Sequence, residues 1–212
     1  KLNSVSVCNL QTEEWSGKEN CLGCHMSVTV GAPSVDSDRK THYSHLFPGA
    51  HFSEMLAWAA TLDMKALKQG GKYFLTVSIF NQNAHKLPSM QPFRVAFLQV
   101  KAYDAGGKVV WQNFKEAPQE DEGAVFVKLF GKGDKVGVPT WEADRVAVDT
   151  RIGPRSEISR FYEIETALRP VKVQAQLFYY LVPPPLLKAF GLQPDGYIEK
   201  AHFLASQELP LD

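Results

Sequence analysis

One short motif carries most of the chemistry that this sequence can be expected to perform. Cys21-Leu22-Gly23-Cys24-His25 has the C-x-x-C-H spacing of a covalent haem attachment site. The two thiols lie close to one helical turn apart, a separation that suits thioether bonds to the two vinyl groups of a haem. The imidazole that follows is then a ligand of the iron. We therefore expect one covalent haem c on Cys21 and Cys24, with His25 as an axial ligand.

Two other chemistries also use paired cysteines. A thioredoxin-like dithiol opens a helix that follows a β-strand, whereas residues 9–20 before this motif are largely polar and show no strand pattern. A zinc site needs a second pair of ligands at suitable spacing, and His42 and His45 could supply one. Zinc therefore stays open as the alternative to haem.

The second axial ligand decides the redox chemistry, because a second His gives a low-potential haem and a Met raises the potential. His45 is our first choice, since it lies on an expected loop 20 residues after His25. His85 is second, at the end of an expected strand and close to Pro88. The remaining candidates rank lower: His51 and Met90 as weak alternatives, and His42 and His202 as expected surface residues.

Composition bounds the class of protein. The chain has 212 residues with 23 basic and 23 acidic side chains, so its formal charge is zero. A nucleic-acid partner, which favours a basic surface, is therefore not expected. No apolar run has the length of a membrane span, and no secretion signal is visible.

Haem c is attached outside the cytoplasm, so we expect a periplasmic or otherwise extracytoplasmic chain whose signal has been removed. Cys8 is left over once the other two cysteines carry haem. It is expected to be an inert buried thiol, with an intermolecular disulfide as the alternative.

Hydrophobic periodicity predicts a mainly β (α+β) chain in three parts. Residues 1–70 form a haem-binding segment with one helix over 53–68, where Met55, Ala59, Leu62 and Ala66 make one apolar stripe. Residues 71–182 alternate with a period of two and predict an immunoglobulin-like β-sandwich of about seven strands. Residues 183–212 form a tail with short helices, near 186–190 and 198–205.

The order of motifs resembles the C-terminal part of multihaem c-type cytochromes, over roughly residues 20–182. The matching segments are Cys21-Leu22-Gly23-Cys24-His25-Met26, Ser44-His45-Leu46-Phe47-Pro48-Gly49, the stretch from Asn83 to Ser89, and Asp149-Thr150-Arg151-Ile152-Gly153-Pro154. The resemblance implies a haem site and an S-H-x-F-x-G segment, here with His45, followed by a β-sandwich that carries a G-H-x-x-P-T-G loop, here with His85. This chain departs from the pattern in having one C-x-x-C-H site, Ala84 before His85, and Ser89-Met90 after Pro88.

These features predict a monohaem c-type cytochrome that transfers single electrons and is not an enzyme. With one haem per chain, any relay needs haems on partner chains, so the expected partners are other cytochromes or redox proteins in an oligomer or larger assembly. One alternative is a structural or docking haem subunit of a redox complex or polymer. Another is a haem enzyme with an open iron site.

Overall fold

A computed structural model describes residues 21–89, 91, 93–193, 196, 198 and 200–211 of the chain. Cys8 and Met90 lie outside the described residues. The helices are α1 (Cys21–His25), α2 (Ser53–Ala57) and α3 (Pro184–Ala189), with two 3₁₀ turns, η2 (Pro118–Glu120) and η3 (Glu122–Ala124). The strands are β1 (Val28–Val30), β2 (Thr41–Tyr43), β3 (Ala60–Gln69), β4 (Lys72–Asn81), β5 (Val95–Tyr103), β6 (Val109–Gln112), β7 (Val125–Lys132), β8 (Lys135–Val136), β9 (Arg145–Asp149), β10 (Glu157–Ile164), β11 (Lys172–Tyr180) and β12 (Ala201–Pro210).

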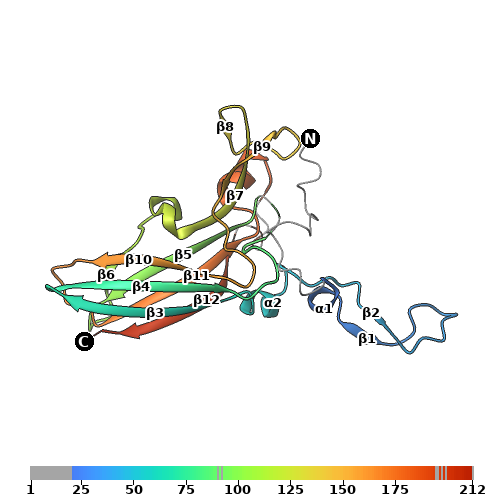
Figure 1. Ribbon diagram of the computed structural model, residues 1–212, viewed down its shortest axis with the longest axis horizontal. Helices are drawn as coiled ribbons and strands as arrows, with labels where there is room; N and C mark the ends of the chain where they lie inside the picture. The colour runs from blue at the N-terminus through green and yellow to red at the C-terminus, as the bar shows by residue number, and fades with distance from the viewer. Residues whose placement is uncertain are drawn as a thin grey trace.

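Two antiparallel sheets form the body of the molecule (Figure 1). One sheet has the order β10-β4-β3, and the other runs β12-β11-β5-β7-β8, with β6 on β5 and β9 on β7. The predicted mainly β sandwich is confirmed, and the described sheets hold ten strands where about seven were expected. The three additional strands are β3, β8 and β12.

The core lies between the sheets and follows from strict alternation along the strands. Every second side chain of β4 and β11 is buried, because successive residues of a strand point to opposite faces. The buried positions of these two strands are Tyr73, Leu75, Val77, Ile79, Asn81, Val173, Ala175, Leu177 and Tyr179. The alternation that predicted the sandwich thus also identifies its inner faces.

The predicted helix over 53–68 is wrong beyond its first turn and a half. The helix α2 ends at Ala57, and β3 begins at Ala60 and pairs with β4 over ten residues. The apolar residues of this stretch fit a period of two as well as a helical period, since Ala60 and Met64 face the core. Gly70 and Gly71, with φ of +59° and +81°, form the two-residue turn of a β-hairpin and do not end a helix.

The C-terminal part of the chain also differs from the prediction. The short helix near 186–190 is present as α3, but the second predicted helix is wrong, because Ala201–Pro210 is the edge strand β12. It pairs with β11 along its whole length, and Leu204 is buried. The paired strands of the two sheets therefore extend from Ala60 to Pro210, on both sides of the expected 71–182.

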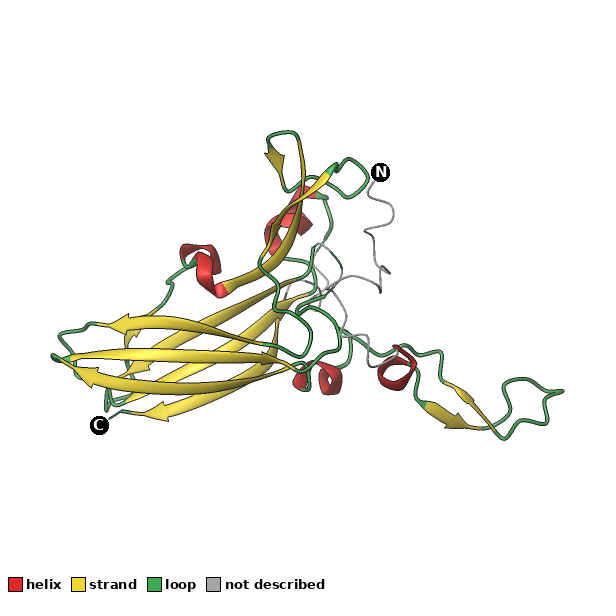
Figure 2. Cartoon of the chain, viewed as in Figure 1, coloured by secondary structure: helices red, strands yellow, loops and turns green. Residues whose placement is uncertain are grey.

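The segment that contains the C-x-x-C-H motif lies at one end of the sandwich. Figure 2 shows α1 between the sheets and the β1–β2 hairpin, which extends away from the body of the molecule. No residue of β1 or β2 is buried. Any ligand that the sandwich offers to this segment must therefore come from loops at the nearby end of the sheets.

Candidate haem-binding site

The helix α1 presents the whole C-x-x-C-H motif on five residues. The thiols of Cys21 and Cys24 are free and exposed. Spacing of three positions on a helix puts both side chains on neighbouring parts of one surface. Two exposed free thiols of this kind fit covalent attachment of a haem, and His25 follows directly at the end of the helix.

The imidazole of His25 is oriented by the segment that the S-H-x-F-x-G pattern marks. Its Nδ1 atom lies 2.5 Å from the carbonyl oxygen of Pro48. The ring of Phe47 stacks on it with centroids 4.9 Å apart and planes 14° from parallel. A ligand imidazole commonly donates its second N–H to a carbonyl in this way, which leaves Nε2 for the metal.

A second imidazole, that of His85, lies close to the ring of His25. The two ring centroids are 6.5 Å apart and the ring planes are 18° from parallel. Nδ1 of His85 lies 3.0 Å from the carbonyl oxygen of Lys86, so Nε2 is again the nitrogen available to a metal. Burial lowers the pKa of His85, with smaller contributions from the nearby His25 and Arg151 and an opposing one from the Lys86 carbonyl. The lowered pKa favours the neutral imidazole that a metal requires.

The separation of the two rings fits one metal ion bound between them. A metal–imidazole bond is about 2 Å long, and a ring nitrogen lies about 1 Å from its ring centroid. Two imidazoles on opposite sides of one ion therefore place their centroids about 6 Å apart, close to the observed 6.5 Å. His25 and His85 are therefore the residues that could hold a haem iron between them.

The loop that carries His85 is secured by Asn81, the last residue of β4. Asn81 is fully buried, and its Nδ2 lies 2.8 Å from the His85 carbonyl oxygen and 2.7 Å from that of Gly153. Its Oδ1 accepts a hydrogen bond from the backbone N–H of Asn83 at 2.9 Å. Leu87 and Ile152 add a two-way backbone bridge between the same segments. The loop that carries His85 is therefore attached to Ile152 and Gly153 by hydrogen bonds.

A charged cluster attaches the same loop from its other end. The guanidinium of Arg151 contacts both carboxylate oxygens of Asp149 at 2.8 Å and donates to the Ser89 carbonyl at 2.9 Å. Lys86 donates to Asp149 at 3.0 Å. Burial raises the pKa of Asp149, but the hydrogen bonds from Arg151 and Lys86 outweigh it and hold that pKa well below its ordinary value. Asp149 is therefore ionised at any ordinary pH.

The other histidines considered as ligands lie on other segments of the chain. His45, the first choice for the sixth ligand, is exposed on the loop between β2 and α2. His42 is half-buried, with Nδ1 3.0 Å from the Gly31 carbonyl, His51 is exposed, and His202 lies on β12. Among the described residues, no group of three or more His, Cys, Asp and Glu side chains could hold a metal ion.

Sequence reasoning missed the residues that support the two imidazoles. Asn81 gave a usable signal, because it occupies the next inward position after Ile79 in the alternation of β4, where an apolar side chain is expected. Phe47 and Pro48 belong to the S-H-x-F-x-G segment, but nothing in the sequence assigned their contacts to His25. Nothing in the sequence assigned a role to Arg151 either, since its bonds to Ser89 and Asp149 depend on the folded chain.

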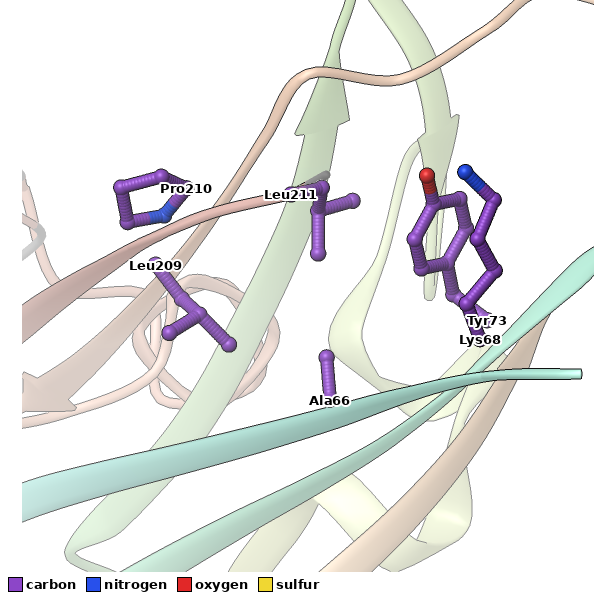
Figure 3. Close-up of a pocket in the computed structure, with 6 residues that line it drawn as sticks. All are labelled: Ala66, Lys68, Tyr73, Leu209, Pro210 and Leu211. Atoms are coloured by element: carbon purple, nitrogen blue, oxygen red, sulfur yellow. The ribbon is translucent and has the colours of Figure 1, made fainter.

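One pocket lies at the opposite end of β4 from the His85 loop. It has a volume of about 310 Å³, and Figure 3 shows the side chains around it, with Lys68 beside the ring of Tyr73. The lining residues come from β3, β4 and the C-terminal end of β12: Ala66, Lys68, Tyr73, Leu209, Pro210 and Leu211. The residues that line the pocket therefore do not include His25 or His85.

No helix in the described part of the chain is both long and apolar enough to cross a membrane.

This chain is similar to a solved structure, a penta-haem cytochrome c552 from Thermochromatium tepidum, with 28% sequence identity and a TM-score of 0.78. The alignment covers 92% of this chain and 48% of that chain, so this chain spans about half the length of the cytochrome it matches. The match supports a fold like that of a multihaem c-type cytochrome, as the order of motifs predicted.

A second solved structure, a superoxide reductase in the oxidised state, has 10% identity and a TM-score of 0.34, and covers 72% of this chain and 87% of that chain. Similarity at that level supports no inference about this chain. No protein-family model and no curated protein matches the sequence.

Proposed function

We propose that this chain is an extracytoplasmic c-type cytochrome unit that transfers single electrons through one covalent haem. Cys21 and Cys24 hold the haem through thioether bonds, and His25 is one axial ligand. The proposal is supported by two exposed free thiols on α1 and by the similarity to a penta-haem cytochrome c552. Haem iron with two axial imidazoles supplies one-electron oxidation and reduction.

The observation that carries this function is the His25–His85 pair. Two imidazoles whose ring centroids lie 6.5 Å apart would fill both axial positions of one iron. An iron with both positions filled has no site for a substrate, so this arrangement favours electron transfer over a haem enzyme with an open iron. The buried surroundings of His85 keep its imidazole neutral and available.

His85, rather than His45, is the sixth ligand in this proposal. Its ring lies beside that of His25 and its loop is fastened to the sandwich by buried hydrogen bonds. His45 is exposed, and no contact between its ring and that of His25 supports ligation. The ranking reached from the sequence is therefore reversed in the proposal, and His45 remains the alternative that the experiment must test.

We further propose that the unit works inside a larger redox assembly. Electron transfer needs a donor and an acceptor, and this chain has one C-x-x-C-H motif. The matched cytochrome carries five haems on a chain about twice as long. Other cytochromes or redox proteins are the partners that we propose for this unit.

Two measurements on protein produced with its maturation system test the function. The intact mass should exceed that of the polypeptide by one haem, and that excess should disappear in the Cys21→Ser, Cys24→Ser double variant. The electronic spectrum should be low-spin in both oxidation states, and the ferrous protein should not bind carbon monoxide promptly. A bare polypeptide mass would exclude covalent haem, and a high-spin spectrum would exclude the two-imidazole site.

A further inference from the structure

We infer that Asn81 and Arg151 are positioning residues that hold the imidazole of His85 at the iron. This inference rests on the proposed function, since it concerns the ligand proposed there. The two side chains bind the same loop at two points, Asn81 at the carbonyl of His85 and Arg151 at the carbonyl of Ser89. Both connect that loop to the 149–153 segment, so His85 is held between two anchors.

The first anchor is a buried amide whose hydrogen bonds are all made inside the protein. Nδ2 of Asn81 lies within hydrogen-bond distance of three carbonyl oxygens, at 2.8 Å from His85, 3.2 Å from Ile152 and 2.7 Å from Gly153. A buried polar group with all its partners makes a rigid connection, and an unpartnered one is strongly unfavourable. Loss of this amide therefore releases the backbone on both sides of it at once.

The second anchor is a guanidinium whose orientation is determined by Asp149. The side chain of Arg151 is 0% exposed, and two of its nitrogens each lie 2.8 Å from a carboxylate oxygen of Asp149. A third nitrogen is thereby directed at the Ser89 carbonyl, 2.9 Å away. Lysine keeps the charge but cannot form a two-point contact and a third bond from one planar group.

The chain offers a matched control for Asn81. Asn113 also bridges separate segments, since its Oδ1 accepts from Val100 at 2.8 Å and its Nδ2 donates to Leu98 at 3.0 Å and to Asp121 at 2.8 Å. These bonds join β5 to the η2–η3 region and do not involve the His85 loop. Replacing either asparagine removes a comparable set of bonds, but only Asn81 bears on the proposed ligand.

The test uses the haem-loaded protein with three substitutions, Asn81→Leu, Arg151→Lys and Asn113→Leu, beside His85→Ala as the reference for a missing ligand. Spin state and the affinity of the ferrous protein for carbon monoxide are measured. Asn81→Leu and Arg151→Lys should each raise that affinity about tenfold or more, a change equivalent to about 1.4 kcal/mol. Added imidazole should return both variants to the low-spin spectrum, which a general loss of stability would not allow.

Asn113→Leu should lower the unfolding midpoint and leave both the spin state and the carbon monoxide affinity as in the parent protein. If His85→Ala opens the iron but the Asn81 and Arg151 variants keep the parent affinity, the inference about positioning is wrong and the proposed ligation stands. If His85→Ala itself leaves the spectrum unchanged, the proposed ligation is wrong. Should Asn81→Leu fail to fold, Arg151→Lys decides the question by the same readouts.

Discussion

The imidazole rings of His25 and His85 lie with their centroids 6.5 Å apart, although one belongs to α1 and the other follows β4. Each ring uses Nδ1 in a contact with a backbone carbonyl, of Pro48 and of Lys86 respectively. Each therefore keeps Nε2 for another partner. The two imidazoles are therefore the candidate ligands of the site.

Removal of the second imidazole should expose the iron. In the haem-loaded His85→Ala variant we expect a five-coordinate, high-spin ferrous state that binds carbon monoxide rapidly, because the variant lacks the side chain proposed as the second ligand. The His45→Ala variant should keep the low-spin spectrum of the parent protein. Stopped-flow mixing with carbon monoxide, read in the Soret region, separates the two cases, and the opposite pattern would restore His45 as the ligand.

The stability of the protein should depend on pH through Asp149. Its pKa in the folded state lies well below the ordinary value of 3.8, so the ionised carboxylate stabilises the native state above about pH 4. That contribution is lost as the pH falls below about 4, because the unfolded chain then binds a proton that the folded chain excludes. The stability difference between the parent protein and Asp149→Asn should be largest near neutral pH and should shrink in acid. Urea unfolding at several pH values, followed by circular dichroism, measures it.

Phe47 should act through both its ring and its backbone. It stacks on His25 and has a φ of +46°, in the left-handed region that favours glycine. Phe47→Ala loses the ring contact and should cost about 1 kcal/mol. Phe47→Gly loses the same contact but relieves a left-handed penalty of about 1–2 kcal/mol, which exceeds the added entropy of the unfolded chain, about 0.4–1 kcal/mol.

The glycine variant of Phe47 should therefore unfold at a higher denaturant concentration than the alanine variant. Phe47→Tyr, which retains the stacked ring, should stay close to the parent protein. An alanine variant as stable as the glycine variant would mean that the backbone at this position is not strained.

In the turn between β3 and β4, replacement of Gly70 by Asn should leave stability nearly unchanged, whereas replacement of Gly71 by Val should lower it. A two-residue turn with positive φ at both positions favours Asn-Gly, so Gly70→Asn should change stability by less than about 0.5 kcal/mol. Gly71→Val should destabilise the protein by about 1–3 kcal/mol, because a β-branched residue is strained at a φ of +81°. A Cβ at either position meets no atom within 4 Å, so thermal unfolding of the two variants reports backbone conformation alone.

Local patterns in the sequence were enough to predict the strands with strict alternation. The C-x-x-C-H motif is confined to five residues of α1, and the buried positions of β4 and β11 alternate without a break. The stretch from Ala60 to Gln69 could not be assigned this way, because its apolar residues satisfy both a helical and a strand period. Ten residues of pairing with β4 decide in favour of the strand.

The support of the site could not be predicted because it depends on contacts between distant segments. Asn81 acts through carbonyls of Ile152 and Gly153, and Arg151 acts through Ser89. Such partners are set by tertiary structure and leave no local periodicity. The position of His85 beside His25 is set in the same way, since spacing along the chain does not determine which loop returns to α1.

The division of the proposed site between α1 and the end of the sandwich has a consequence for how the protein matures. Thioether formation needs a local recognition sequence, so it can take place on a chain whose sheets have yet to assemble. In the proposed site, the second imidazole would reach the iron only after β4 and the 149–153 segment have come together. Five-coordinate haem would then mark a newly made chain, and the appearance of the six-coordinate spectrum would time the completion of folding.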